Sequence, residues 1–171
     1  MSERPAARAL VITVSDRAAT GVYEDRSGPL AAVLLADAGY EVAPVVVVPD
    51  DVGAITAALH GAVGDGVELV VTTGGTGISP RDVTPEATLR VVDRTIPGIA
   101  EALRAETRDR VPTSVLSRGI AGVVRRTLVV NLPGSTGGVR DGVAVLVPIL
   151  AHALAQLRGE GDHGRAQATR S

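Results

Sequence analysis

The sequence predicts a three-layer α/β/α fold, in which a mostly parallel sheet lies between two layers of helices. Strand-like and helix-like segments alternate along the first half of the chain. The strand-like segments are nearly continuous runs of Val, Ile and Leu, as in sheets covered on both faces. The 171 residues suit one domain. We expect it at residues 9–158, between a flexible N-terminus (1–8) and a polar, disordered tail (159–171).

The first half of the chain is expected to contain three strands, each followed by a helix or a turn. The first strand enters a loop that extends through Gly21. The first helix has Ser27 as its expected cap and Pro29 near its start. In chain order we expect a strand at 10–14, a helix at 30–38, a strand at 42–48, a helix at 52–62, a strand at 69–73 and a glycine-rich turn at 73–77.

The second half is expected to begin with two helices. Thr84 is the expected cap of the first helix, with Pro85 at its first position, and the second helix follows Pro97. The remaining expected elements are strands at 122–125 and 128–131 around a tight connection, and a closing helix at 139–157 with a kink at Pro148.

The composition excludes several classes of protein. Aromatic residues make up 1% of the chain and the net charge is -2, so we expect no nucleic-acid partner. All basic residues are arginines, which excludes a lysine-containing P-loop and Schiff-base chemistry. Without cysteine there is no thiolate nucleophile or zinc–thiolate site. The apolar run at 10–14 is too short for a signal peptide or a membrane span, so we expect a cytoplasmic protein with no membrane partner.

The loops that follow the predicted strands carry the candidate site. Ligands of open α/β sheets bind outside the carboxyl ends of the strands. The glycines of the turn would let backbone N–H groups approach an anion, although they could also serve only to make a tight turn. A dinucleotide-binding fingerprint fits poorly, because Pro80 stands where it requires glycine or alanine. The loops that could converge on one cleft lie at 15–17, 49–51, 73–82 and 133–135.

Two acidic residues among these loops are candidate metal ligands. Asp82 follows the glycine turn, where it could merely favour a helix dipole. A carboxylate beside a bound phosphate is repelled unless a cation lies between them, and Mg²⁺ takes one or two carboxylates together with phosphates. Asp50 offers the second carboxylate. The three histidines, His60, His152 and His163, have no serine or acid at an informative spacing and are not expected to act in catalysis.

Five blocks in a fixed order resemble the MogA/MoaB family of molybdenum cofactor biosynthesis proteins. The resemblance spans residues 10–157 and implies a molybdopterin-binding-domain-like fold. It also implies a homo-oligomer, with a trimer favoured over a hexamer. The blocks are Val14 to Arg17, Thr72 to Gly77, Arg81 to Glu86, Pro112 to Arg118 and Asn131 to Ser135.

The resemblance further implies the activity of a molybdopterin adenylyltransferase. This nucleotidyltransferase moves AMP from Mg-ATP to the terminal phosphate of molybdopterin and releases pyrophosphate, so the expected partners are molybdopterin and ATP and the expected cofactor is Mg²⁺. Asp50 and Asp82 match the catalytic and metal-binding acids of the family. The expected substrate-binding residues are Ser15, Asp16, Thr73, Gly74, Gly75, Thr76, Gly77, Ser117, Pro133, Gly134 and Ser135.

The sequence departs from the family at one place and leaves two alternatives open. Many members carry Pro and often Lys after the Pro-Gly-Ser or Pro-Gly-Gln motif, whereas this chain has no lysine there and offers Arg140 instead. A MoaB-like paralogue would keep the pterin site with little or no catalysis. A non-catalytic oligomeric scaffold would use the Ala/Val-rich helices as interfaces and the glycine loop only as a turn.

Overall fold

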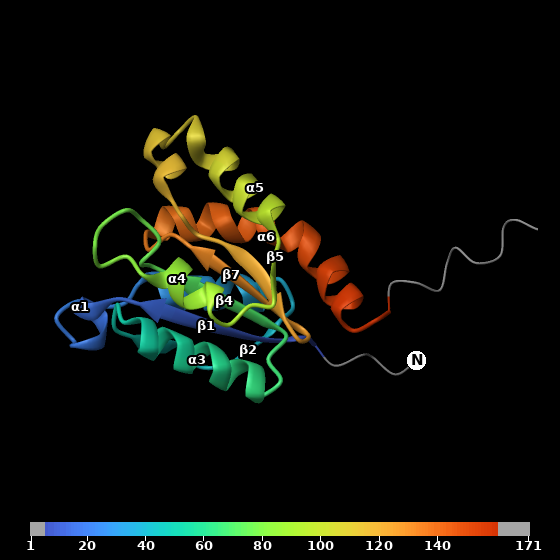
Figure 1. The fold of residues 1–171 in the computed structure, drawn as a ribbon. Coiled ribbons are helices and arrows are strands. Elements are labelled where there is room, and N and C mark those ends of the chain that lie inside the picture. The colour runs from blue at the N-terminus through green and yellow to red at the C-terminus, as the bar shows by residue number, and fades with distance from the viewer. Residues whose placement is uncertain (1–5, 161–171) are drawn as a thin grey trace, which may run out of the picture.

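The computed structural model describes residues 6–160, which form a mixed sheet covered by helices on both faces (Figure 1). The sheet order is β2-β1-β4-β7-β6-β5, and β3 also pairs with β1. The elements are β1 (Arg8–Val14), α1 (Asp16–Ala19), α2 (Ser27–Asp37), β2 (Glu41–Val42), β3 (Val46–Val48), α3 (Val52–Gly64), β4 (Leu69–Thr73), α4 (Thr84–Leu89), β5 (Arg94–Thr95), α5 (Pro97–Arg108), the 3-10 helix η1 (Pro112–Leu116), β6 (Ala121–Val124), β7 (Thr127–Leu132) and α6 (Thr136–Leu157).

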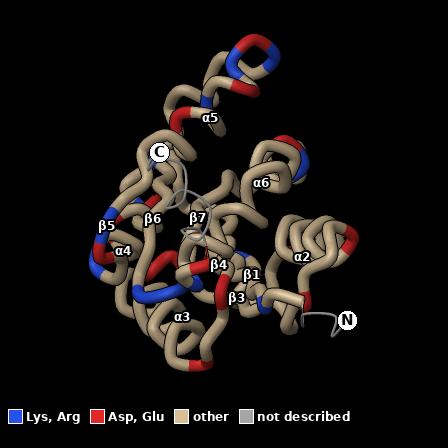
Figure 2. Tube along the Cα trace, turned by 90° about the vertical axis from the view of Figure 1, so that its right-hand side faces the viewer, with Lys and Arg blue, Asp and Glu red and all other residues tan. Residues whose placement is uncertain are grey.

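Two hydrophobic clusters, one on each face of the sheet, confirm the predicted three-layer α/β/α class. Because successive side chains of a strand point to opposite faces, Val11 of β1 belongs to the cluster beneath α2 and α6, and Ile12 belongs to the cluster beneath α3 and α4. Both side chains are fully buried. Figure 2 shows α2 and α6 on one side of the strands and α3 and α4 on the other.

The parallel strands bring the candidate loops to one edge of the sheet. β1 and β4 are parallel with Thr13 opposite Thr73, and β4 and β7 are parallel with Thr73 opposite Leu132. β3 runs parallel to β1 and ends at Val48 opposite Val14. β5 and β6 are antiparallel additions on the far side of β7. We call the edge where β1, β3, β4 and β7 end the carboxyl edge.

The single strand predicted at 42–48 is wrong, because two short strands occupy this segment. β2 pairs with the start of β1, with Glu41 opposite Arg8, and β3 pairs with the end of β1, with Val46 opposite Ile12. Pro44 lies between them and has no N–H to donate to a ladder. The chain therefore leaves the sheet for three residues and rejoins it.

Two helix starts differ from the predicted caps. Asp25, not Ser27, accepts the N–H of Gly28 at 3.0 Å at the start of α2, and Ser27 is already helical. Thr84 is the first residue of α4 rather than its cap, because its hydroxyl donates to the Gly74 carbonyl oxygen instead. At α2 the accepting side chain therefore lies two residues before the predicted cap, whereas at α4 the hydroxyl of Thr84 bonds to a residue ten positions away.

Several boundaries were also missed. α1 occupies part of the predicted loop through Gly21, and β5 and η1 had no predicted counterpart. α6 begins at Thr136, three residues before the predicted start, because Ser135 caps it by accepting the N–H of Gly138 at 3.0 Å. β1 includes Arg8, which was predicted to be flexible, while most of the predicted tail, at 161–171, lies outside the described residues.

Among residues 6–160, α6 is the one helix long and apolar enough to cross a membrane by length and composition. In this structure its buried face packs on the sheet, with Leu146 and Leu150 completely buried in the cluster shared with α2. The helix is continuous through Pro148. Its role here is to complete one of the two core layers.

A prediction for stability follows from the ion pair between Arg158 and Glu68. Both side chains are 23% exposed, and Arg158 Nε donates to Glu68 Oε1 at 2.5 Å. This hydrogen bond is the main reason that the pKa of Glu68 lies below its ordinary value. Replacing Glu68 with Gln is expected to lower the free energy of unfolding at pH 7 by about 1–2 kcal/mol.

Because the folded-state pKa of Glu68 is depressed, its contribution is present above the unfolded pKa and is lost as pH falls through the folded pKa. Urea unfolding at pH 7 and near pH 3 measures this, and the difference between wild type and Glu68→Gln should shrink at the lower pH. Glu101→Gln, at an exposed glutamate of α5, is the matched control with no expected change. Equal stability of wild type and Glu68→Gln at pH 7 would contradict the prediction.

Candidate active site

The glycine turn at 74–77 lies at the centre of the carboxyl edge and touches the neighbouring loops. Gly74 has φ of 99° and Gly75 has φ of 64°, in the region that favours glycine. A Cβ on Gly74 would lie 2.3 Å from the Val14 carbonyl oxygen, and a Cβ on Gly134 would lie 3.2 Å from Gly74 Cα. Close backbone approach therefore requires these glycines and joins the loops that follow β1, β4 and β7.

The backbone of the turn presents a row of unpaired N–H donors. The carbonyl oxygens of residues 74–75 accept hydrogen bonds from Oγ1 and N of Thr84, at 2.9 and 3.1 Å. Those of residues 76–77 accept from N and Nε of Arg118, both at 2.7 Å. Across residues 6–160, nothing accepts a hydrogen bond from the N–H groups of residues 75–78. Successive free N–H groups of this kind make a concavity suited to an anion.

Asp50 and Asp82 flank the turn on two sides. Asp50 Oδ1 lies 3.1 Å from the position that a Cβ would take on Gly75, and Asp82 Oδ2 lies 2.8 Å from the corresponding position on Gly77. In each carboxylate Oδ2 accepts one backbone N–H at 2.9 Å. Oδ1 accepts none from the part of the chain that the structure describes, so each acid keeps one oxygen for another partner.

Asp16 and Asp50 hold the loops after β1 and β3 together. Asp16 N donates to Asp50 Oδ2 and Asp50 N donates to Asp16 Oδ1, both at 2.9 Å. Arg81 pairs with Asp16, and this hydrogen bond lowers the pKa of Asp16, with the N–H of Asp50 acting in the same direction. Asp51 instead caps α3 by accepting the N–H of Ala54 at 2.8 Å. Asp50, not Asp51, therefore faces the glycine turn.

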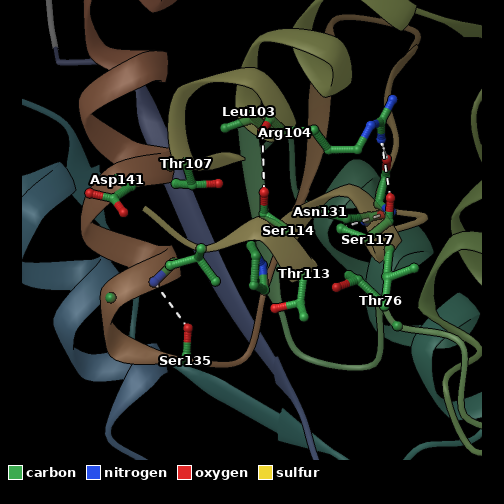
Figure 3. Close-up of a pocket in the computed structure, with 18 of the residues that line it drawn as sticks. Thr76, Leu103, Arg104, Thr107, Thr113, Ser114, Ser117, Asn131, Ser135 and Asp141 are labelled. Atoms are coloured by element: carbon green, nitrogen blue, oxygen red, sulfur yellow. Dashed lines mark hydrogen bonds between the residues drawn. The ribbon is translucent and has the colours of Figure 1, made fainter. Parts of the chain in front are cut away.

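Two cavities lie on either side of the 133–135 loop. The first, of about 340 Å³, is bounded by the glycine turn, α5, η1 and the start of α6, and its wall is mostly apolar (Figure 3). Thr76, Ser117 and Ser135 line it. The second, of about 400 Å³, is lined by Ser15, Thr73 and again Ser135. We call them the α5–α6 cavity and the α1–α2 cavity.

The comparisons with known proteins decide the family. Residues 10–152 match the family described as "Probable molybdopterin binding domain". The chain belongs to this molybdopterin-binding family. It is 44% identical over 156 residues to a molybdenum cofactor biosynthesis bifunctional protein of Synechococcus elongatus, covering 91% of this chain and 49% of that protein. It is 36% identical over 154 residues to a molybdopterin adenylyltransferase of Helicobacter pylori, covering 87% and 86%.

The chain spans about half the length of the bifunctional relatives it matches. Solved structures of the molybdopterin-binding family agree with the fold. A structure described as "anomalous substructure of MogA" is 52% identical with a TM-score of 0.85, covering 88% of this chain and 99% of that one. A molybdopterin biosynthesis protein from Mycobacterium abscessus is 50% identical with a TM-score of 0.85, covering 90% and 97%. MoaB from Thermus thermophilus is 42% identical with a TM-score of 0.84, covering 90% and 97%.

In this member of the molybdopterin-binding family, several expected ligand residues also hold the loops together. Thr73 Oγ1 donates to the Pro133 carbonyl oxygen at 2.9 Å. Gly74 N donates to the Leu132 carbonyl oxygen at 3.1 Å, so this N–H is not among the free donors of the turn. Ser15 Oγ accepts from Ala18 N at 3.2 Å and caps α1. Serine oxygens can accept a second bond, so capping leaves Ser15 able to meet a ligand.

A buried polar network that sequence reasoning missed supports the turn from below. Asn131 Nδ2 donates to Thr72 Oγ1 at 2.9 Å and to Thr88 Oγ1 at 3.0 Å. Thr88 Oγ1 then donates to the Thr84 carbonyl oxygen at 2.8 Å, and Thr84 Oγ1 reaches the Gly74 carbonyl oxygen. All are at most 2% exposed. The network links β7 through α4 to the glycine turn.

The positions of two arginines differ from the roles that the sequence suggested for them. Arg118 appeared only as part of a family block, yet its main chain and guanidinium contact the glycine turn directly. Arg140, the proposed substitute for the missing lysine, is exposed on α6 and lines neither cavity. Asp50 and Asp82 also lie outside both cavity walls, at the glycine turn between them.

Proposed function

We propose that the protein is a molybdopterin adenylyltransferase that transfers AMP from Mg-ATP to the terminal phosphate of molybdopterin and releases pyrophosphate. One observation carries the proposal. The free N–H donors of residues 75–78 lie between two carboxylates, Asp50 and Asp82, each of which keeps one oxygen available. This combination suits a phosphorylated ligand whose charge is shared between backbone donors and a cation.

The chemistry requires little of the side chains. A phosphate oxygen of molybdopterin forms a bond to the α-phosphorus of ATP, while the bond from that phosphorus to the bridging oxygen breaks and pyrophosphate leaves with the electron pair. A phosphate monoester has a second pKa of about 6 and is already ionised at neutral pH. No general base is needed, which fits a site without a histidine or a cysteine among its residues. The remaining tasks are orientation and stabilisation of charge.

The donor set fits Mg²⁺. Within residues 6–160 no group of three or more His, Cys, Asp or Glu could hold a metal ion by itself. Mg²⁺ is commonly bound by one or two carboxylates plus substrate phosphates and water. Asp50 and Asp82 would supply these carboxylates. When bound, the ion would neutralise charge on the phosphates, and the N–H groups of the turn would orient them.

The two cavities give room for a ligand with two parts. Both border the 133–135 loop, and Ser135 lines each of them. The α5–α6 cavity, with its mostly apolar wall, and the α1–α2 cavity, with its serines and threonines, would accept the pterin and nucleotide portions on either side of this loop.

We also propose a homotrimer. Exposed Val111, Val115 and Leu116, which cluster around η1, offer apolar surface for contact between copies.

The experiment that tests this function is direct. Purified protein is incubated with molybdopterin and Mg-ATP, and adenylylated molybdopterin is identified by mass spectrometry while released pyrophosphate is quantified. We expect both products in equal amounts, and none when molybdopterin is omitted. A protein that binds the pterin but releases no pyrophosphate would contradict the proposal and favour a non-catalytic, MoaB-like role.

A further inference from the structure

Arg118 is fixed by contacts that all lie around the glycine turn and the start of α4. Its main-chain N–H donates to the Thr76 carbonyl oxygen, its Nε to the Gly77 carbonyl oxygen and one terminal nitrogen to the Asp82 carbonyl oxygen, each at 2.7 Å. Its guanidinium also pairs with Glu86 of α4. The side chain is 38% exposed, yet nearly every donor it has is used.

These contacts determine the direction of the neighbouring N–H groups. No peptide bond of the described residues is cis, and in a planar trans peptide the carbonyl of one residue points opposite to the N–H of the next. Because the carbonyls of Thr76 and Gly77 point to Arg118, the N–H groups of Gly77 and Ile78 point away from it. Thr84 holds the carbonyl oxygens of Gly74 and Gly75 in the same way, so the N–H groups of the residues that follow them point away from Thr84. The free donors of the turn therefore face away from the residues that hold their peptides, which are Thr84 for the first two and Arg118 for the last two.

We propose that Arg118 is a positioning residue that aims two N–H groups at a bound phosphate without touching the phosphate itself. Its main chain holds the peptide that carries the N–H of Gly77, and its side chain holds the peptide that carries the N–H of Ile78. The proposal rests on the proposed function of this site. Through the Asp82 carbonyl, the same side chain also fixes the backbone of one proposed metal ligand. Glu86 neutralises the guanidinium, so Arg118 acts by orienting the backbone rather than by adding positive charge to the site.

Inorganic pyrophosphate is the probe for the first test. Its binding to the full-length protein is followed by the amide NMR signals of Gly75, Gly77 and Ile78. In the variant Arg118→Ala we expect binding to weaken by about 10–100-fold, and millimolar guanidinium to restore it. Arg118→Lys should recover little, because one ammonium cannot span the carbonyls of Gly77 and Asp82 and the carboxylate of Glu86, which the guanidinium reaches together.

Glu86→Gln distinguishes orientation from charge. If Arg118 acted through its charge, removing the neighbouring carboxylate would leave that charge uncompensated and pyrophosphate would bind more tightly. If Arg118 acts by holding the backbone, binding stays unchanged or weakens. Tighter binding to Glu86→Gln, or wild-type binding to Arg118→Ala, would overturn the proposal.

Arg158→Ala is the matched control. Arg158 makes a comparable ion pair with Glu68, away from the glycine turn, so its removal should lower the melting temperature and leave pyrophosphate binding as in the wild type. The binding assay also separates this proposal from the proposed function. A wild type that binds pyrophosphate in an Arg118-dependent way but transfers no AMP would refute the enzyme activity alone. A wild type that transfers AMP while Arg118→Ala retains full kcat would refute the role of Arg118 alone.

Discussion

Replacing Asp82 with Asn is expected to reduce AMP transfer by about 100-fold or more while leaving the fold intact. Asp82 Oδ2 accepts the N–H of Ser79 at 2.9 Å, and an asparagine oxygen can accept the same bond. The substitution therefore removes the negative charge beside the glycine turn and little else. Single-turnover measurement of pyrophosphate release at saturating molybdopterin and Mg-ATP checks the loss, and thermal melting checks the fold.

Asp51→Asn provides the matched control for this loss of charge. Asp51 neighbours Asp50 in sequence, but its carboxylate caps α3 through the N–H of Ala54. Asparagine is an equally good helix cap, so stability and turnover should both remain close to wild type. Turnover of Asp82→Asn within twofold of the wild type would rule out the role assigned to Asp82.

Replacing Gly74 with Ala is expected to give the largest loss of stability, about 3–5 kcal/mol. Its φ of 99° is strained for any residue with a side chain, and the added Cβ would lie 2.3 Å from the Val14 carbonyl oxygen. That oxygen belongs to the backbone of β1 and cannot move without disturbing the sheet. For a chain of this size the loss corresponds to a fall in melting temperature of roughly 10–15 °C, measurable by calorimetry.

The same chemical change has the opposite expected sign at Gly61. This glycine lies inside α3 with open space around the position of a Cβ, so alanine should raise the stability by about 0.5–1 kcal/mol through its higher helix propensity. If Gly74→Ala and Gly61→Ala changed the melting temperature equally, the close approach at Gly74 could not be the reason for its glycine.

The layered fold was predictable because its signals are local. The buried strands β1, β4 and β7 are short apolar runs, and the apolar residues of α2 and α3 repeat at helical spacing, so strand and helix could be assigned from neighbouring residues. The segment at 42–48 failed because a run of valines outweighed Pro44, whose missing N–H breaks the ladder. Short elements such as β5 and η1 depend on tertiary contacts, which a local sequence pattern does not predict.

The candidate site was predictable in its residues but not in how they are held. The glycines, Asp50 and Asp82 stand out because each follows a strand, and parallel strands bring their carboxyl ends to one edge. The hydrogen bonds by which Arg118, Thr84 and Asn131 hold the site could not be predicted from the sequence. These residues bond to parts of the chain about 10 to 60 positions away. Only the folded structure reveals which carbonyl or hydroxyl oxygen each of them engages.

The occupied carbonyls of the glycine turn have a consequence for how a ligand arrives. Because Thr84 and Arg118 already hold four successive peptides, the entropy lost in fixing this loop is incurred during folding rather than at each encounter. A phosphate would then meet an arranged surface, its association would need no slow rearrangement of the loop, and the backbone would keep nearly one conformation with and without it. For the proposed adenylyltransferase, which would release pyrophosphate in every cycle, this rigidity would let the same N–H donors bind again without a rearrangement of the loop.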